Sequence, residues 1–146
     1  MLINHAELLT QSITKTIVPD IMRLTESLRS TLSKNGVVMI NEMYTQLKRQ
    51  LDCDFDLIFS KLIKKTLDTN SFISEEVKKA LLAVCSNASD TKVVTLLTNT
   101  HISRAIPVKT AIVNILEGIT FLPKFYERGI EKIVLILIDF MSEGSL

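Results

Sequence analysis

The sequence predicts an all-α protein, an α-solenoid of antiparallel helix pairs of the HEAT-like or armadillo-like kind. Three observations support this fold class. Apolar residues recur every three or four positions along nearly all of the 146 residues, which is the spacing of a helix face. No segment alternates strictly between apolar and polar residues, as a half-buried strand would. Turn-forming segments recur near residues 27, 71 and 105, at intervals close to the period of about 40–47 residues of HEAT repeats.

The first helix pair is expected before residue 52. Leu9, Ile13 and Ile17 form a short apolar stripe, and Pro19 then either kinks the chain or opens a new helix. Gly36 lies on the stripe of the second helix, so we expect another helix to approach it closely. That stripe consists of Leu28, Leu32, Gly36, Ile40, Met43, Leu47 and Leu51.

The second pair is expected to begin at Asp54, which can cap a helix over residues 55–67. Residues 68–71 have the composition of a turn. Ser74 can cap the next helix. The residues predicted to point inward are Phe55, Ile58, Phe59, Leu62 and Ile63 on the first helix, and Val77, Ala80, Leu81 and Val84 on the second.

The third pair is predicted as a helix over residues 91–100, a turn over residues 103–106, and a helix that starts at Pro107 and ends near Thr120. The first of these helices presents Val93, Val94, Leu96 and Leu97. The apolar stripe of the second is Val108, Ala111, Ile112, Ile115, Leu116 and Ile119.

A last helix is predicted over residues 125–141, after Pro123 interrupts the chain. Residues 133–138 alone have the composition of a strand, but the length of the segment favours a buried helix. These six residues are apolar on all sides. We therefore expect one face on the preceding repeat and another against a further repeat, a second copy or a crystal neighbour. The chain then holds about three and a half repeats in one domain over residues 1–146, or in part of a domain.

Composition excludes several classes of protein. The formal charge is +1 and is balanced along the chain, which does not favour a nucleic-acid binder. Two cysteines, Cys53 and Cys85, cannot form the disulfide framework of a secreted protein. The N-terminus has no basic region of a signal peptide. The longest apolar run, over residues 133–138, is far too short to span a membrane. We expect a cytoplasmic protein with no membrane and no nucleic-acid partner.

No catalytic or metal-binding constellation is evident, so we expect neither an enzyme nor a cofactor. Asp52, Asp54 and Asp56 have the spacing that opens a calcium loop, but Leu57 and Ile63 stand where that loop needs Gly and Glu. This segment is interpreted as a charged turn between helices. The histidines and cysteines are scattered, without the spacing of a zinc site. A nucleophilic Cys–His pair lacks the turn that would accompany it.

Phe72 lies in a polar turn, and the sequence leaves two alternatives for it. The side chain folds back as a hydrophobic staple against its own helix, or it is displayed at the turn. The staple is preferred because such contacts are common where helices begin.

Three segments resemble the TOG domains of microtubule regulators, especially the CLASP and crescerin groups. Residues 28–34, L-R-S-T-L-S-K, are similar to the opening of a second helix in a TOG repeat. Residues 70–76, N-S-F-I-S-E-E, followed by Ala80-Leu81, resemble a crescerin-type repeat. Residues 104–109, R-A-I-P-V-K, resemble the start of a later CLASP-type helix. Their order and spacing agree with one domain.

The resemblance implies a flat stack of HEAT repeats whose intra-repeat turns contact tubulin or microtubules. The residues that it marks as contacts are Arg29 with Lys34, Asn70 with Phe72, and Arg104 with Lys109. Since tubulin's surface is acidic, cations there would steer association. For Arg29 and Lys109, the residues leave a second role open, that of a cation packed as a brace between neighbouring repeats.

The chain also departs from the family pattern. A full TOG domain has about six repeats, and this sequence contains no Trp although family members place one against tubulin. Ser74 and Thr110 stand where the patterns have basic residues. Two functions therefore remain open: a tubulin-binding module of the cytoskeleton, at the cilium or spindle, and a HEAT-type scaffold that binds another protein.

Overall fold

The computed structural model describes residues 5–100, 105–120 and 130–142, and all regular structure in these ranges is helical. The described residues contain no strand, which confirms the predicted all-α class. The elements are α1 (His5–Thr25), α2 (Ser30–Leu47), the 3₁₀ helix η1 (Lys48–Leu51), α3 (Phe55–Lys65), α4 (Ser71–Asn87), α5 (Asp90–Thr100), α6 (Ile106–Thr120) and α7 (Ile130–Ser142).

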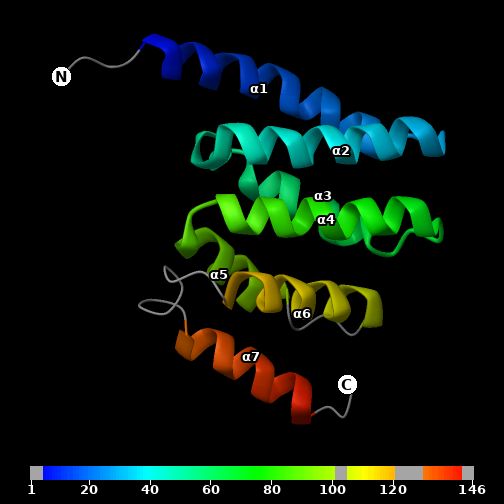
Figure 1. The fold of residues 1–146 in the computed structure, drawn as a ribbon, viewed down its shortest axis with the longest axis vertical. Coiled ribbons are helices and arrows are strands. Elements are labelled where there is room, and N and C mark those ends of the chain that lie inside the picture. The colour runs from blue at the N-terminus through cyan, green and yellow to red at the C-terminus, as the bar shows by residue number, and fades with distance from the viewer. Residues whose placement is uncertain (1–4, 101–104, 121–129, 143–146) are drawn as a thin grey trace.

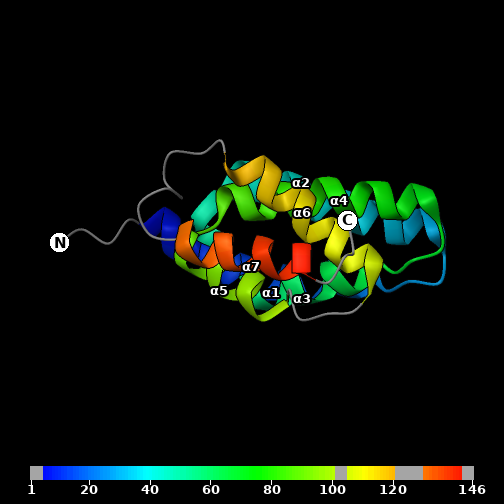
Figure 2. The same cartoon turned by 90° about the horizontal axis from the view of Figure 1, so that it is seen from below.

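The helices stack in sequence order from α1 at one end to α7 at the other (Figure 1). Seen along the stack, α2, α4 and α6 form one layer, and α1, α3, α5 and α7 form the second (Figure 2). α4 lies at the centre and packs against α2, α3 and α6. Three pairs and one further helix confirm a HEAT-like solenoid of about three and a half repeats.

The second helices of all three pairs begin at the same edge of the stack, on the right in Figure 1. We call this the turn edge and define it as the described residues 26–35, 64–73 and 105–106. Successive repeats thus place equivalent turns on one side of the molecule, as the recurrence of turns along the sequence predicts.

The predicted inward faces of α3, α4 and α6 are confirmed. All fifteen residues named for these helices in the sequence analysis are buried, and Cys85 is buried with them. On α5, Val93, Val94 and Leu97 are buried, and Leu96 packs partly buried against the core. In these segments the apolar spacing alone is enough to identify the core face, because most of the apolar residues lie inside a helix and not in a turn.

The prediction for α2 is wrong in part. Leu28 lies before the helix and is fully exposed, and Leu32 is exposed as well. The core face instead includes Ser33 and Tyr44. Both can be buried because their hydroxyls are satisfied: Ser33 Oγ donates to the Thr25 carbonyl at 2.7 Å, and Tyr44 OH donates to the Leu51 carbonyl at 3.3 Å. An apolar pattern cannot detect such positions.

Several predicted helix starts need correction. Pro19 lies inside α1 and opens no new helix. Asp54 occupies the N-cap position of α3, but its side chain makes no capping hydrogen bond. α4 is capped by Asn70 and not by Ser74, because the Asn70 side chain accepts from the backbone N–H of Phe72. Pro107 is the second residue of α6 and not the first.

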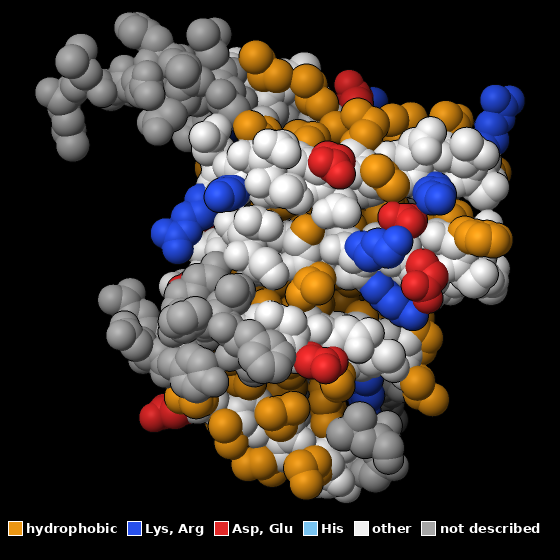
Figure 3. Space-filling model, in the orientation of Figure 1, with side chains coloured by type: hydrophobic (Ala, Val, Ile, Leu, Met, Phe, Trp, Pro, Cys, Tyr) orange, Lys and Arg blue, Asp and Glu red, His pale blue; other side chains and the backbone are white. Residues whose placement is uncertain are grey.

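The last segment is a helix, as predicted, but α7 begins at Ile130. The predicted start at residue 125 lies outside the described residues. Ile133, Ile136 and Phe140 are buried, so one face packs on the preceding repeat. Apolar side chains gather on the outside of α7 at the lower end of the stack (Figure 3), and the exposed ones are Ile130, Val134, Leu135, Leu137, Ile138 and Met141. The expected second apolar face is present, and these side chains are exposed in the described part of the chain.

Two matched substitutions test the orientation of α7. Ile136 is 1% exposed and Ile138 is 55% exposed. Ile136→Val should lower the free energy of unfolding by about 1 kcal/mol, since it removes a buried methylene group. Ile138→Val should change it by less than about 0.3 kcal/mol. Urea unfolding followed by circular dichroism measures both, and equal effects would mean that α7 packs through another face.

Candidate partner-binding edge

A shallow groove of about 370 Å³ runs along the turn edge between the first turns of α2 and α4. It brings together three of the predicted contact residues, Lys34, Asn70 and Phe72. The described residues that line it are Ser30, Thr31, Lys34, Asn35, Asn70, Phe72 and Ile73. Residues 40 positions apart in the sequence thus share one surface, because neighbouring repeats stack with their turns aligned.

The first turn is held by hydrogen bonds between α1, the turn and α2. Ser27 N–H donates to the Leu24 carbonyl at 3.1 Å, and Arg29 N–H donates to Ser27 Oγ at 3.2 Å. The buried Ser33 bonds back to Thr25. The backbone beside Arg29 is therefore fixed relative to the groove, while the Arg29 side chain is exposed.

The second turn is held by Asp68. Its carboxylate accepts from the backbone N–H of Asn70 at 2.9 Å and pairs with Lys65 at 2.8 Å. These contacts, with the Lys65 hydrogen bond the stronger cause and the Asn70 N–H the next, hold the pKa of Asp68 below its ordinary value of 3.8. Asn70 in turn accepts from Phe72 N–H at 3.1 Å. A chain of short local bonds thus positions both Asn70 and Phe72.

The lowered pKa of Asp68 predicts a pH dependence of stability. Its contribution is present above pH 3.8, the ordinary value, and is lost as the pH falls through the lower value of the folded state. At pH 7, Asp68→Asn should reduce the free energy of unfolding by about 0.5–1 kcal/mol. At pH 2.5 the difference from the unsubstituted protein should be smaller. Urea unfolding at the two pH values measures this, and a difference that grows on acidification would contradict it.

Phe72 is displayed and is not folded back. Its side chain is 73% exposed, so the preferred staple interpretation is wrong. The reason is the position of the cap: with Asn70 at the N-cap, Phe72 is the second residue of α4, and the buried position falls on Ile73. The alternative that the sequence left open, an aromatic ring presented at the turn, describes the structure.

Positive charge concentrates on the turn edge. Its described residues contain Arg29, Lys34, Lys64 and Lys65 against Glu26 and Asp68, a net charge of +2 in a chain of net charge +1. Lys61 reaches Glu26 at 2.5 Å and links the first two repeats. An edge with this balance favours contact with an acidic surface, and Lys34 brings a positive charge to the groove itself.

The third predicted pair does not join the groove. Arg104 lies outside the described residues. Lys109 is 9% exposed, and its Nζ lies 5.6 Å from the centre of the Phe140 ring. This is a cation–π contact between α6 and α7. It is the arrangement of a brace between repeats, the second role that the sequence left open for Lys109.

Besides Leu32, sequence reasoning missed three exposed apolar residues of the turn edge. Leu28 is fully exposed, Ile106 is 72% exposed and Leu67 is 53% exposed. Each lies just outside a helix or at its first residue. Leu28 has the spacing of the α2 stripe, and only the start of α2 at Ser30 removes it from the core face. The turn predicted near residue 27 was the available signal, because it places Leu28 before the helix.

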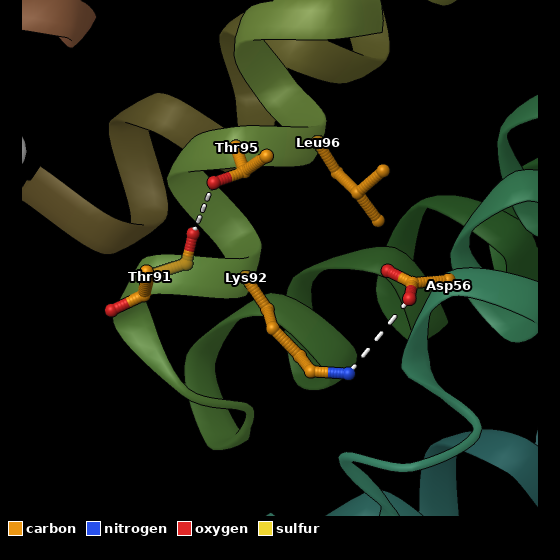
Figure 4. A pocket seen from close by; sticks show the side chains of 5 residues that line it. All are labelled: Asp56, Thr91, Lys92, Thr95 and Leu96. Carbon is orange, nitrogen blue, oxygen red and sulfur yellow. Dashed lines mark hydrogen bonds and ion pairs between the residues drawn. The ribbon is translucent and has the colours of Figure 1, made fainter.

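A second hollow, of about 220 Å³, lies between α3 and α5 and is lined by Asp56, Thr91, Lys92, Thr95 and Leu96 (Figure 4). Lys92 Nζ donates to the Asp52 carbonyl at 2.6 Å and lies 3.8 Å from Asp56. Asp52 Oδ1 also accepts from Ser89 N–H at 3.2 Å. The acidic turn predicted between helices therefore links two repeats through Lys92 and Ser89.

The described part of the chain has no metal-binding cluster, no membrane-spanning helix, and a thiol at Cys85 that is buried. No three His, Cys, Asp or Glu side chains converge there as a metal ion would require. Complete burial raises the pKa of the Cys85 thiol, so it stays protonated and unreactive. Within the same residues, no helix has the length and apolar character needed to cross a membrane.

Stacked helix pairs and hydrogen-bonded turns along one edge define a short HEAT-like α-solenoid of the TOG type. More narrowly, the chain belongs to the CLASP N-terminal family, whose match covers residues 5–120 and therefore α1 through α6. The resemblance seen in the three turn segments is thus confirmed at the level of the family.

Curated relatives are similar over a shorter stretch. TOG array regulator of axonemal microtubules protein 1 is 33% identical in Mus musculus and 32% identical in Homo sapiens, each over 95 residues, or 65% of this chain. Protein peg1 of Schizosaccharomyces pombe is 33% identical over 76 residues, or 52% of the chain. The matches span only 5–6% of these relatives. No solved structure matches the chain significantly.

Proposed function

We propose that this chain is a non-catalytic interaction module of the microtubule cytoskeleton that binds tubulin or microtubules through its turn edge. The observation that carries the proposal is the groove, which joins Lys34, Asn70 and Phe72 from two consecutive repeats. Membership of the CLASP N-terminal family supports it, as do the names of the mouse and human relatives, which refer to axonemal microtubules.

The proposed contact combines long-range attraction by cations with short-range contacts of a polar and an aromatic side chain. Arg29 and Lys34 face an acidic partner and raise the rate of encounter, so binding weakens as salt is added. Asn70 and Phe72 offer a carbonyl or amide group and a ring for short-range contact. Arg104, which precedes the second helix of the third repeat in the sequence, is proposed as a further cation of this edge. Lys109 is proposed to act through the brace with Phe140.

A charge reversal tests the site. Lys34→Glu should lower tubulin affinity at least tenfold at low salt, because it places a carboxylate against an acidic surface. The matched control is Arg49→Glu, the same kind of reversal at an exposed position between α2 and α3, at the opposite edge. Gel filtration with αβ-tubulin at 50 and 150 mM salt gives the shift. Equal loss in both variants would indicate bulk charge and no site at the turn edge.

The alternative function is a HEAT-type scaffold that binds another protein and not tubulin. Two observations favour it: the chain contains no Trp, and Lys109 is packed against Phe140 and offers little surface. If the unsubstituted protein does not shift αβ-tubulin in gel filtration at either salt concentration, the scaffold is favoured over the tubulin-binding module.

The proposed location follows from the proposed partner. We place the protein in the cytoplasm on the cytoskeleton, at the cilium or the spindle. The word axonemal in the names of the mouse and human relatives favours the cilium. A fluorescently tagged protein should then coincide with a tubulin stain in ciliated cells, and uniform cytoplasmic signal would contradict the proposal.

A further inference from the structure

The turn edge presents large apolar side chains in all three repeats, and the most exposed one in each repeat is Leu28, Phe72 or Ile106. Leu28 precedes α2, Phe72 is the second residue of α4, and Ile106 is the first residue of α6. They are fully exposed, 73% exposed and 72% exposed respectively. We call these three side chains the apolar row. Since the second helices begin at the same edge (Figure 1), the row follows the direction of the stack.

The backbone that carries the row is ordered before any partner arrives. The residues on either side of Leu28 are held by the bonds from Ser27 N–H to Leu24 and from Arg29 N–H to Ser27. Phe72 N–H donates to Asn70. Next to Ile106, the Ala105 carbonyl accepts from the N–H groups of Val108 and Lys109. A partner that binds here therefore meets a backbone already held by hydrogen bonds, which lowers the entropy lost on binding.

Isolated apolar side chains are common on protein surfaces, but those in the apolar row share one edge with the charged groove. Arg29 is the next residue after Leu28, and Phe72 lines the groove with Lys34. Hot spots of protein interfaces combine this kind of fixed apolar anchor with surrounding polar residues that exclude water. The cations supply attraction at long range, and the apolar row can supply burial at short range.

We propose that Leu28, Phe72 and Ile106 are the anchors of the partner interface and that the partner offers apolar pockets bordered by carboxylates. This inference rests on the proposed function and deepens it, because it assigns most of the affinity to residues outside the charged set. On tubulin, the contact then has two parts: a salt-sensitive part carried by the cations and a salt-insensitive part carried by the apolar row.

Serine substitutions separate the two parts. Leu28→Ser and Ile106→Ser should each lower tubulin affinity about tenfold at 50 and 150 mM salt alike, because they remove buried apolar area and no charge. Arg29→Ser should instead flatten the salt dependence and lower affinity mainly at 50 mM. Met39→Ser on α2 is the matched control: Met39 is 43% exposed but lies away from the turn edge, so affinity should not change.

Affinity is measured by titration of labelled protein with αβ-tubulin, and circular dichroism melting shows that each variant folds. If the unsubstituted protein binds and both serine variants bind equally well, the apolar row is not an anchor, although the proposed function stands. If Met39→Ser weakens binding as much as Leu28→Ser, the row has no special role. If the unsubstituted protein binds no tubulin, the proposed function is rejected and this inference with it.

Discussion

Lys109→Glu is expected to destabilise the protein by about 3 kcal/mol. The side chain is almost completely buried, with its Nζ over the face of Phe140. A carboxylate there would lose its solvation and would meet the negative face of the ring in place of a cation that the ring attracts. The urea midpoint, followed by circular dichroism, should fall accordingly.

Two controls separate charge from packing. Lys109→Met keeps most of the aliphatic length and should cost less than about 1.5 kcal/mol. Lys132→Glu reverses a charge at an exposed position of α7 and should cost less than about 0.5 kcal/mol. If Lys109→Glu is as stable as Lys132→Glu, the brace does not form in solution. Loss of tubulin binding in an unstable Lys109→Glu protein would not identify Lys109 as a contact.

Gly36→Ala is expected to destabilise the protein by about 2–3 kcal/mol, although alanine is the better helix former by about 1 kcal/mol. A Cβ at this position would lie 2.8 Å from the backbone nitrogen of Thr25 and 3.1 Å from Leu24. Backbone cannot rotate away as a side chain does, so α1 would have to move from α2. The same movement would disturb the turn that carries Leu28 and Arg29.

Gly118→Ala is the matched control. A Cβ at position 118 would meet Cδ1 of Leu82, the end of a flexible side chain that is 38% exposed. Leu82 can adopt another rotamer, and the helix propensity of alanine offsets the cost. The free energy of unfolding should change by less than about 1 kcal/mol. Similar losses for the two glycines would contradict the close approach of α1 to Gly36.

The sequence by itself determined the helical class, the pairing of helices and the spacing of the turns. This was possible because an apolar face repeated every three or four residues is a local property, readable without neighbours. On α3, α4 and α6, every residue that this spacing placed on the core face is buried. The close approach at Gly36 was also predictable, since a glycine on a core face has few other reasons to be there. The family followed from motifs in three turns.

Only the tertiary structure decided which side chains the turn edge displays. The start of a helix depends on which of several candidate residues supplies the N-cap. Phe72 is exposed because Asn70, and not Ser74, caps α4. Ser33 and Tyr44 are buried because partners from α1 and η1 satisfy their hydroxyls, while Leu32 is exposed and Leu28 lies before the helix. Lys109 is covered because α7 places Phe140 against it. In each case the outcome depends on a contact with residues distant in the sequence or on competition between local caps, and apolar spacing along one helix contains no information about either.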